Sequence, residues 1–388
     1  MTNGNRLERF QQMLQQNDLA AGILLSSRDI YYFAGTAMQS VLLIPAQGEA
    51  VLLVIRNYRR AREESPLADI RASTSFSSIK DAVVEKGLAC SIVGLVLDNL
   101  PTATYQRLAG LLPEAKFVDV TRPMRELRMV KDADEIGRIR RAAVLADIGQ
   151  EAASQILRPG VSELEASLEI ELAMVREGHD GYCLPRNLAD IVRTGDVISG
   201  PSLYADSALP TTMPGTGPSS VIAWGPSRRV LAQGDLVVVD LCGTFDGYIA
   251  DEARTYTLGK ATREQHEITE ALEYVINETL GLMRPGTIAS DIFRAAQAAA
   301  ERTPYGAFFL GGKERNVRFV GHGVGLELDE LPMITPGDTT ILAPGMVLAY
   351  EPIIMVPGVG AATLENTLLI TEEGHEILTK RPMHLIEF

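Results

Sequence analysis

Four carboxylates in the second half of the chain lie where they could bind metal ions. Asp240 ends an apolar run, and Asp251 lies on the arm that returns from a tight turn at residues 245–247. Glu351 also ends an apolar run, and Glu365 lies beyond a turn of its own. A single such aspartate is explained by the frequency of Asp in turns. Carboxylates at the ends of buried strands are costly, however, unless a positive charge lies between them.

These two acidic hairpins belong to an internal repeat. Residues 231–240 resemble residues 342–351, and both segments end an apolar strand in a carboxylate. Residues 157–161 and 283–287 also match, and each lies between two predicted helices. The C-terminal region is therefore predicted to contain two copies of a helix, helix and hairpin unit, related by a pseudo-twofold axis. Such an axis brings the hairpins, and with them the four carboxylates, together.

His322 is the fifth candidate ligand, because it lies between the two hairpins with Gly321 and Gly323 on either side. A lone histidine is more often a packed or surface residue, but this position favours an exposed ring close to the carboxylates. Four carboxylates in an apolar setting repel one another unless they are protonated or neutralised. An oxygen-rich set with one imidazole favours manganese, iron or cobalt over a sulfur-rich structural zinc site. Two metal ions sharing carboxylates could acidify a water molecule and stabilise the oxyanion that its attack creates.

The N-terminal part alternates short apolar strands with amphipathic helices, a pattern that predicts an open α/β sheet covered by helices. It contains no glycine-rich phosphate loop and no set of acid, base and nucleophile, so we expect it to support the other region. The predicted strands cover residues 21–25, 40–44, 51–55, 91–97 and 116–120, and the predicted helices cover residues 79–87 and 102–111.

A domain boundary is predicted near residues 121–130, where a proline and a charged run precede a long helix. Residues 195–226 are rich in Gly, Pro, Ser and Thr. We interpret this segment as a long irregular loop that forms a lid or pocket wall and decides the substrate. The helices predicted for the C-terminal region cover residues 132–157, 162–177, 264–283 and 290–302.

The composition is that of an ordinary globular protein. The 388 residues exceed the usual size of one hydrophobic core, which predicts two domains, and 46% of them are apolar. A net charge of -14 argues against a nucleic-acid partner. No apolar run approaches the ~18 residues of a membrane span, and the polar N-terminus lacks the apolar region of a secretion signal. Three widely spaced cysteines fit a reducing compartment, so we expect a cytoplasmic protein without a membrane partner.

With this set of five candidate ligands at family-like spacings, the chain resembles the pita-bread fold enzymes, which include creatinase, prolidase, aminopeptidase P and methionine aminopeptidase. The motif at residues 31–35 resembles the creatinase/prolidase N-terminal domain, and residues 127–142 resemble the family's entry into the catalytic domain. The resemblance implies an α/β N-terminal domain at residues 1–125. It implies an α+β pita-bread catalytic domain with a pseudo-twofold internal repeat at residues 126–388.

The resemblance also implies roles for the five residues. Asp251 and Glu365 would bridge two divalent metal ions, Asp240 would hold one ion, and His322 and Glu351 would hold the other. Glu351 would act as the base or proton shuttle, with His322 as its catalytic neighbour. Manganese is the first expectation for the metal, with iron, cobalt or zinc as alternatives. We expect a homodimer and a metal-dependent hydrolase of small amides or short peptides, similar to Xaa-Pro aminopeptidases and dipeptidases.

The sequence departs from prolidases and aminopeptidases P at two positions where those enzymes carry further histidines. Asp329 occupies one of them, and Ala223 and Trp224 lie near the other. An ionised aspartate would repel a developing oxyanion. One hypothesis is a pocket for a cationic substrate, with Asp329 as counter-ion and Trp224 as a cation–π face, and the alternative is that both are structural. A lyase or C–N hydrolase acting on a small cationic metabolite, and a non-catalytic binding protein, therefore stay open beside the peptidase.

Overall fold

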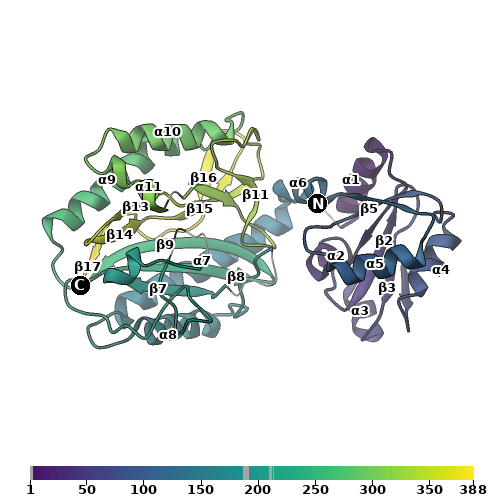
Figure 1. Ribbon diagram of the computed structural model, residues 1–388, viewed down its shortest axis with the longest axis horizontal. Coiled ribbons are helices and arrows are strands. Elements are labelled where there is room, and N and C mark those ends of the chain that lie inside the picture. Colours follow the sequence, from purple (N-terminus) through teal and green to yellow (C-terminus); the bar gives the residue numbers. More distant parts are fainter. Residues whose placement is uncertain (1–2, 187–191, 209–211, 213, 316) are drawn as a thin grey trace. The chain divides into compact units, whose positions relative to one another are not determined.

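In the computed structural model, the described residues are 3–186, 192–208, 212, 214–315 and 317–388. The chain divides into two compact units, Met1–Arg128 and Met129–Phe388, which we describe separately (Figure 1). The division predicted from the sequence lay between residues 125 and 126. None of the helices in the described ranges has the length and apolar character needed to span a membrane.

The first unit contains a six-stranded mixed sheet in the order β4-β3-β2-β1-β5-β6. On β1, Ala21 and Ile23 face a core shared with α4 and α5, whereas Gly22 faces α1. A Cβ on Gly22 would lie 2.6 Å from the Phe10 ring, so the helix packs directly on the strand there. The elements are α1 Asn3–Gln16, β1 Ala21–Leu24, α2 Ser27–Ala34, β2 Ser40–Pro45, β3 Val51–Val54, α3 Tyr58–Glu64, β4 Asp69–Ala72, α4 Ser78–Glu85, β5 Ile92–Leu95, α5 Thr102–Leu111, β6 Lys116–Asp119 and α6 Thr121–Met129.

This arrangement confirms the α/β sheet expected from the sequence, and every predicted strand and helix of this region is present. The prediction missed β4, α2 and α3. β4 and α3 each bury a single residue, Ile70 and Ala61, so their sequences show no apolar period. The segment interpreted as a boundary is helix α6. Pro123 lies in its first turn, where the missing N–H of proline breaks no helical hydrogen bond.

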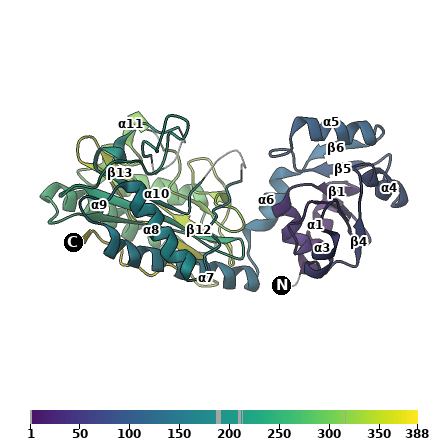
Figure 2. The same ribbon diagram turned by 90° about the horizontal axis from the view of Figure 1, so that it is seen from below.

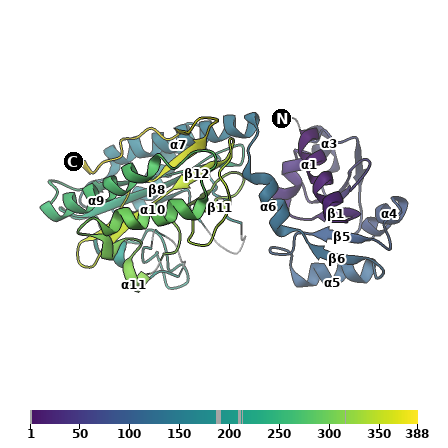
Figure 3. The same cartoon turned by 90° about the horizontal axis from the view of Figure 1, so that it is seen from above.

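The second unit has helices on both faces of its sheets. Helices α7 and α8 pack on β7, β8 and β9, and α9 and α10 lie on the opposite side, as the views from below and above show (Figures 2 and 3). One sheet has the order β17-β9-β8-β7, another has the order β11-β10-β12-β15-β16, and β13 and β14 form a separate pair. The elements are α7 Ala133–Ile156, α8 Glu163–Arg176, β7 Gly195–Ser199, β8 Leu236–Phe245, β9 Tyr248–Thr257, α9 Arg263–Leu280, α10 Ala289–Glu301, α11 Gly312–Arg315, β10 Gly321–Gly323, β11 Glu330–Met333, β12 Val347–Tyr350, β13 Ile353–Val356, β14 Gly360–Thr363, β15 Asn366–Ile370, β16 His375–Ile377 and β17 Ile386–Glu387.

The interpretation of residues 195–226 as one irregular loop is wrong at its start. Gly195–Ser199 is strand β7, which pairs antiparallel with β8, and Gly200–Tyr204 is a 3₁₀ turn. The strand contains only five residues, of which the first is Gly195, and its two apolar residues, Val197 and Ile198, are adjacent, so the sequence shows no alternation. Residues 209–211 and 213 of this segment lie outside the described residues.

The internal repeat is visible in matching backbone contacts. In the first copy the Gly160 N–H donates to Leu231 O, and in the second copy the Gly286 N–H donates to Leu342 O. Isolated bridges join Ser162 to Val230 and Ile288 to Ile341 at the same relative positions. The order helix, helix, hairpin therefore occurs twice, as the sequence predicted.

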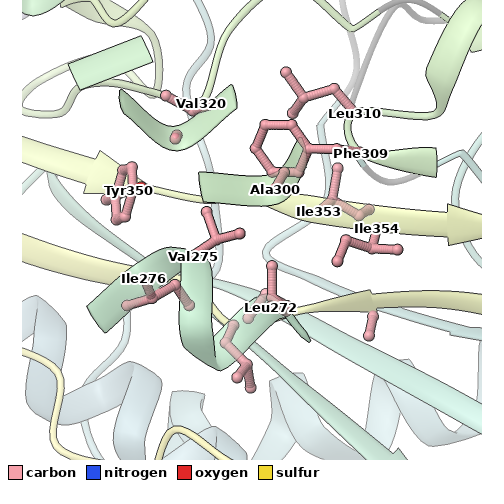
Figure 4. Close-up of a cluster of buried hydrophobic side chains, with 14 of the residues drawn as sticks. Leu272, Val275, Ile276, Ala300, Phe309, Leu310, Val320, Tyr350, Ile353 and Ile354 are labelled. Carbon is pink, nitrogen blue, oxygen red and sulfur yellow. The ribbon is translucent and has the colours of Figure 1, made fainter. Parts of the chain in front are cut away.

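A large apolar core fixes the second hairpin against α9 and α10. Leu272 and Val275 of α9 pack with Ile353 and Ile354 of β13 in one buried cluster, which also includes Tyr350 of β12 (Figure 4). Burial of side chains of this size contributes roughly 1.5–3 kcal/mol each. The two strands that flank Glu351 are therefore held rigidly from the helical side.

Candidate metal centre

The first hairpin positions Asp240 and Asp251 on one face of the sheet. Strands β8 and β9 pair over their whole length, with Asp240 opposite Ala253 and Cys242 opposite Asp251. Opposite residues of an antiparallel pair share a face, so the two carboxylates point to the same side. The turn is Asp246-Gly247, both with positive φ, which suits a two-residue hairpin loop.

The second hairpin differs from its prediction because it is broken in the middle. β12 pairs with β15, β13 pairs with β14, and Glu351 and Glu365 lie where one pairing gives way to the other. Pro352 follows Glu351 and has no N–H to continue the ladder. The carboxylates therefore occupy a break in the strands, close to where the sequence placed them.

Backbone contacts join the two hairpins. The Glu365 N–H donates to Ala253 O at 3.0 Å, and the Asp251 N–H donates to the hydroxyl of Thr367 at 2.8 Å. The fully buried Arg254 guanidinium donates to the backbone oxygen of Glu365, so a side chain of one hairpin also ties down the other. Sequence reasoning missed this residue, because nothing in the segment signals its burial.

His322 lies on the short strand β10, which pairs with β11 on one side and with β12 on the other. A Cβ on Gly321 would lie 2.4 Å from Ala349 O, and a Cβ on Gly323 would lie 2.3 Å from Leu331 O. Only glycine fits at both positions, which is the close backbone approach that the sequence indicated. The imidazole Nε2 of His322 lies 3.0 Å from Oε1 of Glu351.

Three of the predicted ligands form a compact donor group. Asp251, His322 and Glu365 each offer one atom, and these atoms all lie within 4.8 Å of one another. The other two adjoin it: Glu351 contacts His322, and Asp240 lies on the same face of the β8–β9 pair as Asp251 and lines the same cavity. All five are therefore brought together around one point.

The carboxylates resist ionisation in this arrangement. Burial raises the pKa of Asp251 to about 7, although the charge of His322 acts in the opposite direction. Burial also raises the pKa of Asp240 and of Glu365 well above their usual range, and the charge of Asp251 adds to both effects. The causes are loss of hydration and mutual repulsion, which a bound cation would remove.

His322, in contrast to the carboxylates, favours its charged form. Burial acts to lower its pKa, but the hydrogen bond to Glu351 and the charges of Asp329 and the other carboxylates outweigh it and raise the pKa to about 10. In the metal-free protein the ring is therefore a cation among acids. A metal ligand must be neutral imidazole, so a metal ion would replace this proton.

The donor set fits a divalent metal centre. Oε1 of Glu365 is buried without a hydrogen-bond partner among the described residues, although a buried carboxylate normally has one. Four carboxylates and one imidazole match hard or intermediate divalent ions. The arrangement explains both the unpaired oxygen and the raised carboxylate pKa values if cations lie between these groups.

The same residues line a cavity of about 330 Å³. Trp224 and Asp329, the predicted substrate residues, lie in its wall together with the five candidate ligands. Oδ1 of Asp329 lies 3.9 Å from Nδ1 of His322, and its side chain is 49% exposed. The structure thus brings all seven predicted residues to one cavity, while their roles as ligands or substrate contacts stay predictions.

Among the lining residues that were not predicted from the sequence, Arg193, Asp196 and Thr212 carry a charged group or a hydroxyl. The Thr212 hydroxyl donates to Oε2 of Glu351 at 2.7 Å, and Arg193 pairs with Glu171 at 2.8 Å. Burial raises the pKa of Asp196 to about 7. All three lie in or beside the segment interpreted as a loop, and a carboxylate on a short strand was the one signal that could have indicated Asp196.

Comparison with known proteins agrees with this site. Residues 6–130 match the creatinase/prolidase N-terminal domain, and residues 137–372 match metallopeptidase family M24. The chain belongs to metallopeptidase family M24. The predicted order of a creatinase-like N-terminal domain and a pita-bread domain is thereby confirmed.

Relatives of this family cover the whole chain. The Xaa-Pro dipeptidase of Pyrococcus furiosus is 27% identical, over 98% of this chain and 99% of its own length. Among solved structures, the Xaa-Pro dipeptidase from Bacillus anthracis has a TM-score of 0.85 at 25% identity and covers 100% of both chains. Dipeptidase PepE from Mycobacterium ulcerans has a TM-score of 0.82 at 26% identity and covers 99% of this chain and 97% of its own.

Family membership settles the class of activity. The chain is an enzyme, a metal-dependent hydrolase that uses divalent metal ions, as the resemblance implied.

Proposed function

We propose that this M24 enzyme hydrolyses short peptides of the Xaa-Pro type, using metal ions held by Asp240, Asp251, His322, Glu351 and Glu365. The observation that supports it most is the buried, mutually repelling carboxylate cluster beside the cavity. Full-length similarity to proteins named Xaa-Pro dipeptidase supports the substrate class. When bound, divalent ions supply the charge that acidifies a water molecule and polarises the scissile carbonyl.

Glu351 is the residue best placed to move protons. One of its oxygens faces Nε2 of His322 at 3.0 Å, and the other accepts from the Thr212 hydroxyl at 2.7 Å. These contacts fix the carboxylate in one orientation beside the cavity. In our proposal it takes a proton from the attacking water and returns it to the leaving nitrogen.

The test is release of proline from Ala-Pro by protein loaded with Mn²⁺, before and after chelation. Glu351→Gln should lower kcat by about 100- to 10,000-fold, the usual contribution of a general base. Glu376→Gln is the matched control, because Glu376 is a partly exposed carboxylate paired with Arg140 outside the cavity. Wild-type rates in Glu351→Gln would refute its role, and no release by metal-loaded wild type would refute the substrate class.

A second candidate is hydrolysis or elimination at a C–N bond of a small cationic metabolite. The half-exposed carboxylate of Asp329 in the cavity wall supports it, with Trp224 as a cation–π face. Asp329→His should raise Xaa-Pro turnover and abolish any preference for cationic amides. An unchanged preference in this variant would remove the counter-ion role of Asp329.

We propose manganese as the metal, with iron, cobalt or zinc as alternatives, and a cytoplasmic homodimer as the working form. The oxygen-rich donor set supports manganese, and three free cysteines support a reducing compartment. We also propose residues 1–125 and 126–388 as the two domains. Activity after reconstitution with each metal, and sedimentation of the loaded protein, test the metal and the dimer.

A further inference from the structure

Asp196 is a carboxylate of the cavity wall that has no role in the metal set, in the proton shuttle or, unlike Asp329, in the second candidate function. It lies on β7 directly opposite Asp240 on β8. Opposite residues of an antiparallel pair have Cβ atoms about 4.5–5.5 Å apart, and like charges there destabilise the sheet. The pairing of β7 with β8 needs no acid at this position, so a compensating positive charge would explain its presence.

Within the described ranges, no positively charged group is hydrogen-bonded to Oδ1 of Asp196. Oδ1 of Asp196 is buried and has no hydrogen-bond partner among the described residues. The neighbouring cation, Arg193, is engaged by Glu171 at 2.8 Å. An unpaired buried carboxylate oxygen costs free energy, which a bound cation would recover.

Asp196 lies in a cavity that could hold a ligand. It lines the metal cavity together with Trp224. The backbone at Gly225, the residue after Trp224, packs against the carboxylate, since a Cβ there would lie 3.3 Å from Oδ1 of Asp196. A cationic nitrogen held by this carboxylate would lie near both the indole ring and the metal ligand Asp240.

We propose that Asp196 is the counter-ion for a cationic nitrogen of the substrate, either its free amino terminus or a basic side chain on its N-terminal residue. This inference rests on the proposed peptide-hydrolysing function. It makes Asp196 a specificity residue that binds substrate and does not hold metal.

Three amides separate the two sources of the nitrogen. Hexanamide has neither cation, norleucinamide adds the amino terminus, and lysinamide adds the side-chain ammonium at nearly the same size. Their binding is measured by calorimetry on Mn²⁺-loaded protein for wild type and Asp196→Asn. Asp206→Asn is the control, because Asp206 is exposed outside the cavity and its substitution removes the same charge.

Asp196→Asn should weaken one of two preferences by about ten- to a hundredfold, the worth of a hydrogen bond to a charged group. Loss of the norleucinamide-over-hexanamide preference assigns the amino terminus, and loss of the lysinamide-over-norleucinamide preference assigns the side chain. Unchanged preferences would overturn the proposal, as would the same loss in Asp206→Asn. Bound manganese should equal that of wild type, and loss of an ion would make Asp196 a ligand and overturn the proposal.

The binding readout keeps this inference separate from the proposed function. Absence of dipeptide turnover by wild type would refute the peptidase, yet the amide preferences would still report on Asp196. Asp196→Asn should unfold at or above the wild-type temperature, because it removes a like charge opposite Asp240. A folded variant therefore makes every binding result interpretable.

Discussion

The chelated protein should become more stable as the pH falls from about 8 to 5, the reverse of what the metal-loaded protein does. The perturbation is removal of the metal ions, which leaves Asp251 buried among other acids. Its pKa is raised by burial from 3.8 to about 7 in the folded protein. The folded state therefore binds a proton that the unfolded state releases between these two values, and stability is lost as the pH rises through 7.

The size of the effect follows from that shift. About three pKa units correspond to roughly 4 kcal/mol in full, and the part titrated between pH 8 and 5 is about 2–3 kcal/mol. Asp240 and Glu365 shift in the same direction, so they do not oppose the trend. In the loaded protein protons compete with the metal for the same ligands, so stability should fall as the pH falls.

Urea unfolding at several pH values measures how the free energy of unfolding depends on pH, once with chelator and once with Mn²⁺. Asp251→Asn is the matched control, because the amide cannot titrate and the difference from wild type isolates this one group. A chelated wild type whose stability is flat or increases with pH across this window, with the same slope in Asp251→Asn, would refute the clustering of ionisable carboxylates.

Three further results are expected. Binding of Mn²⁺ should release at least one proton per chain near pH 7, because His322, with a pKa of about 10, must become neutral to bind the metal. Calorimetry in buffers of different ionisation enthalpy measures this release, and metal uptake without proton release would contradict the prediction. Arg254→Met should lower the free energy of unfolding in urea by about 3–5 kcal/mol, because it leaves Glu252 buried without the guanidinium that lies 2.8 Å away. The double variant with Glu252→Gln should recover much of this loss. Gly323→Ala should reduce both stability and metal affinity, because its Cβ would lie 2.3 Å from Leu331 O, and wild-type affinity in a folded variant would argue against that close contact.

The sequence was sufficient for features encoded by local pattern. The tight turn at residues 245–247, which follows an apolar run, predicted the first hairpin, and the repeated segments predicted the second copy. The glycines beside His322 indicated close backbone packing, which the tight contacts of Gly321 and Gly323 explain.

Features that depend on tertiary contact were not predictable. Asp196 lies on a strand too short to show alternation, so its place opposite Asp240 emerges only from the sheet register. Burial of Arg254 depends on partners more than 100 residues away, which no local pattern reveals. The break in the second hairpin at Pro352 changes which strands pair, although it leaves Glu351 and Glu365 beside the cavity.

The most direct test counts bound manganese and measures proline release on the same preparation of wild type and Asp251→Asn. We expect two ions per wild-type chain, fewer in the variant, and proline release from Ala-Pro that rises in step with metal occupancy. Full activity in metal-free protein, or a folded wild type that binds no manganese, iron, cobalt or zinc, would contradict this expectation.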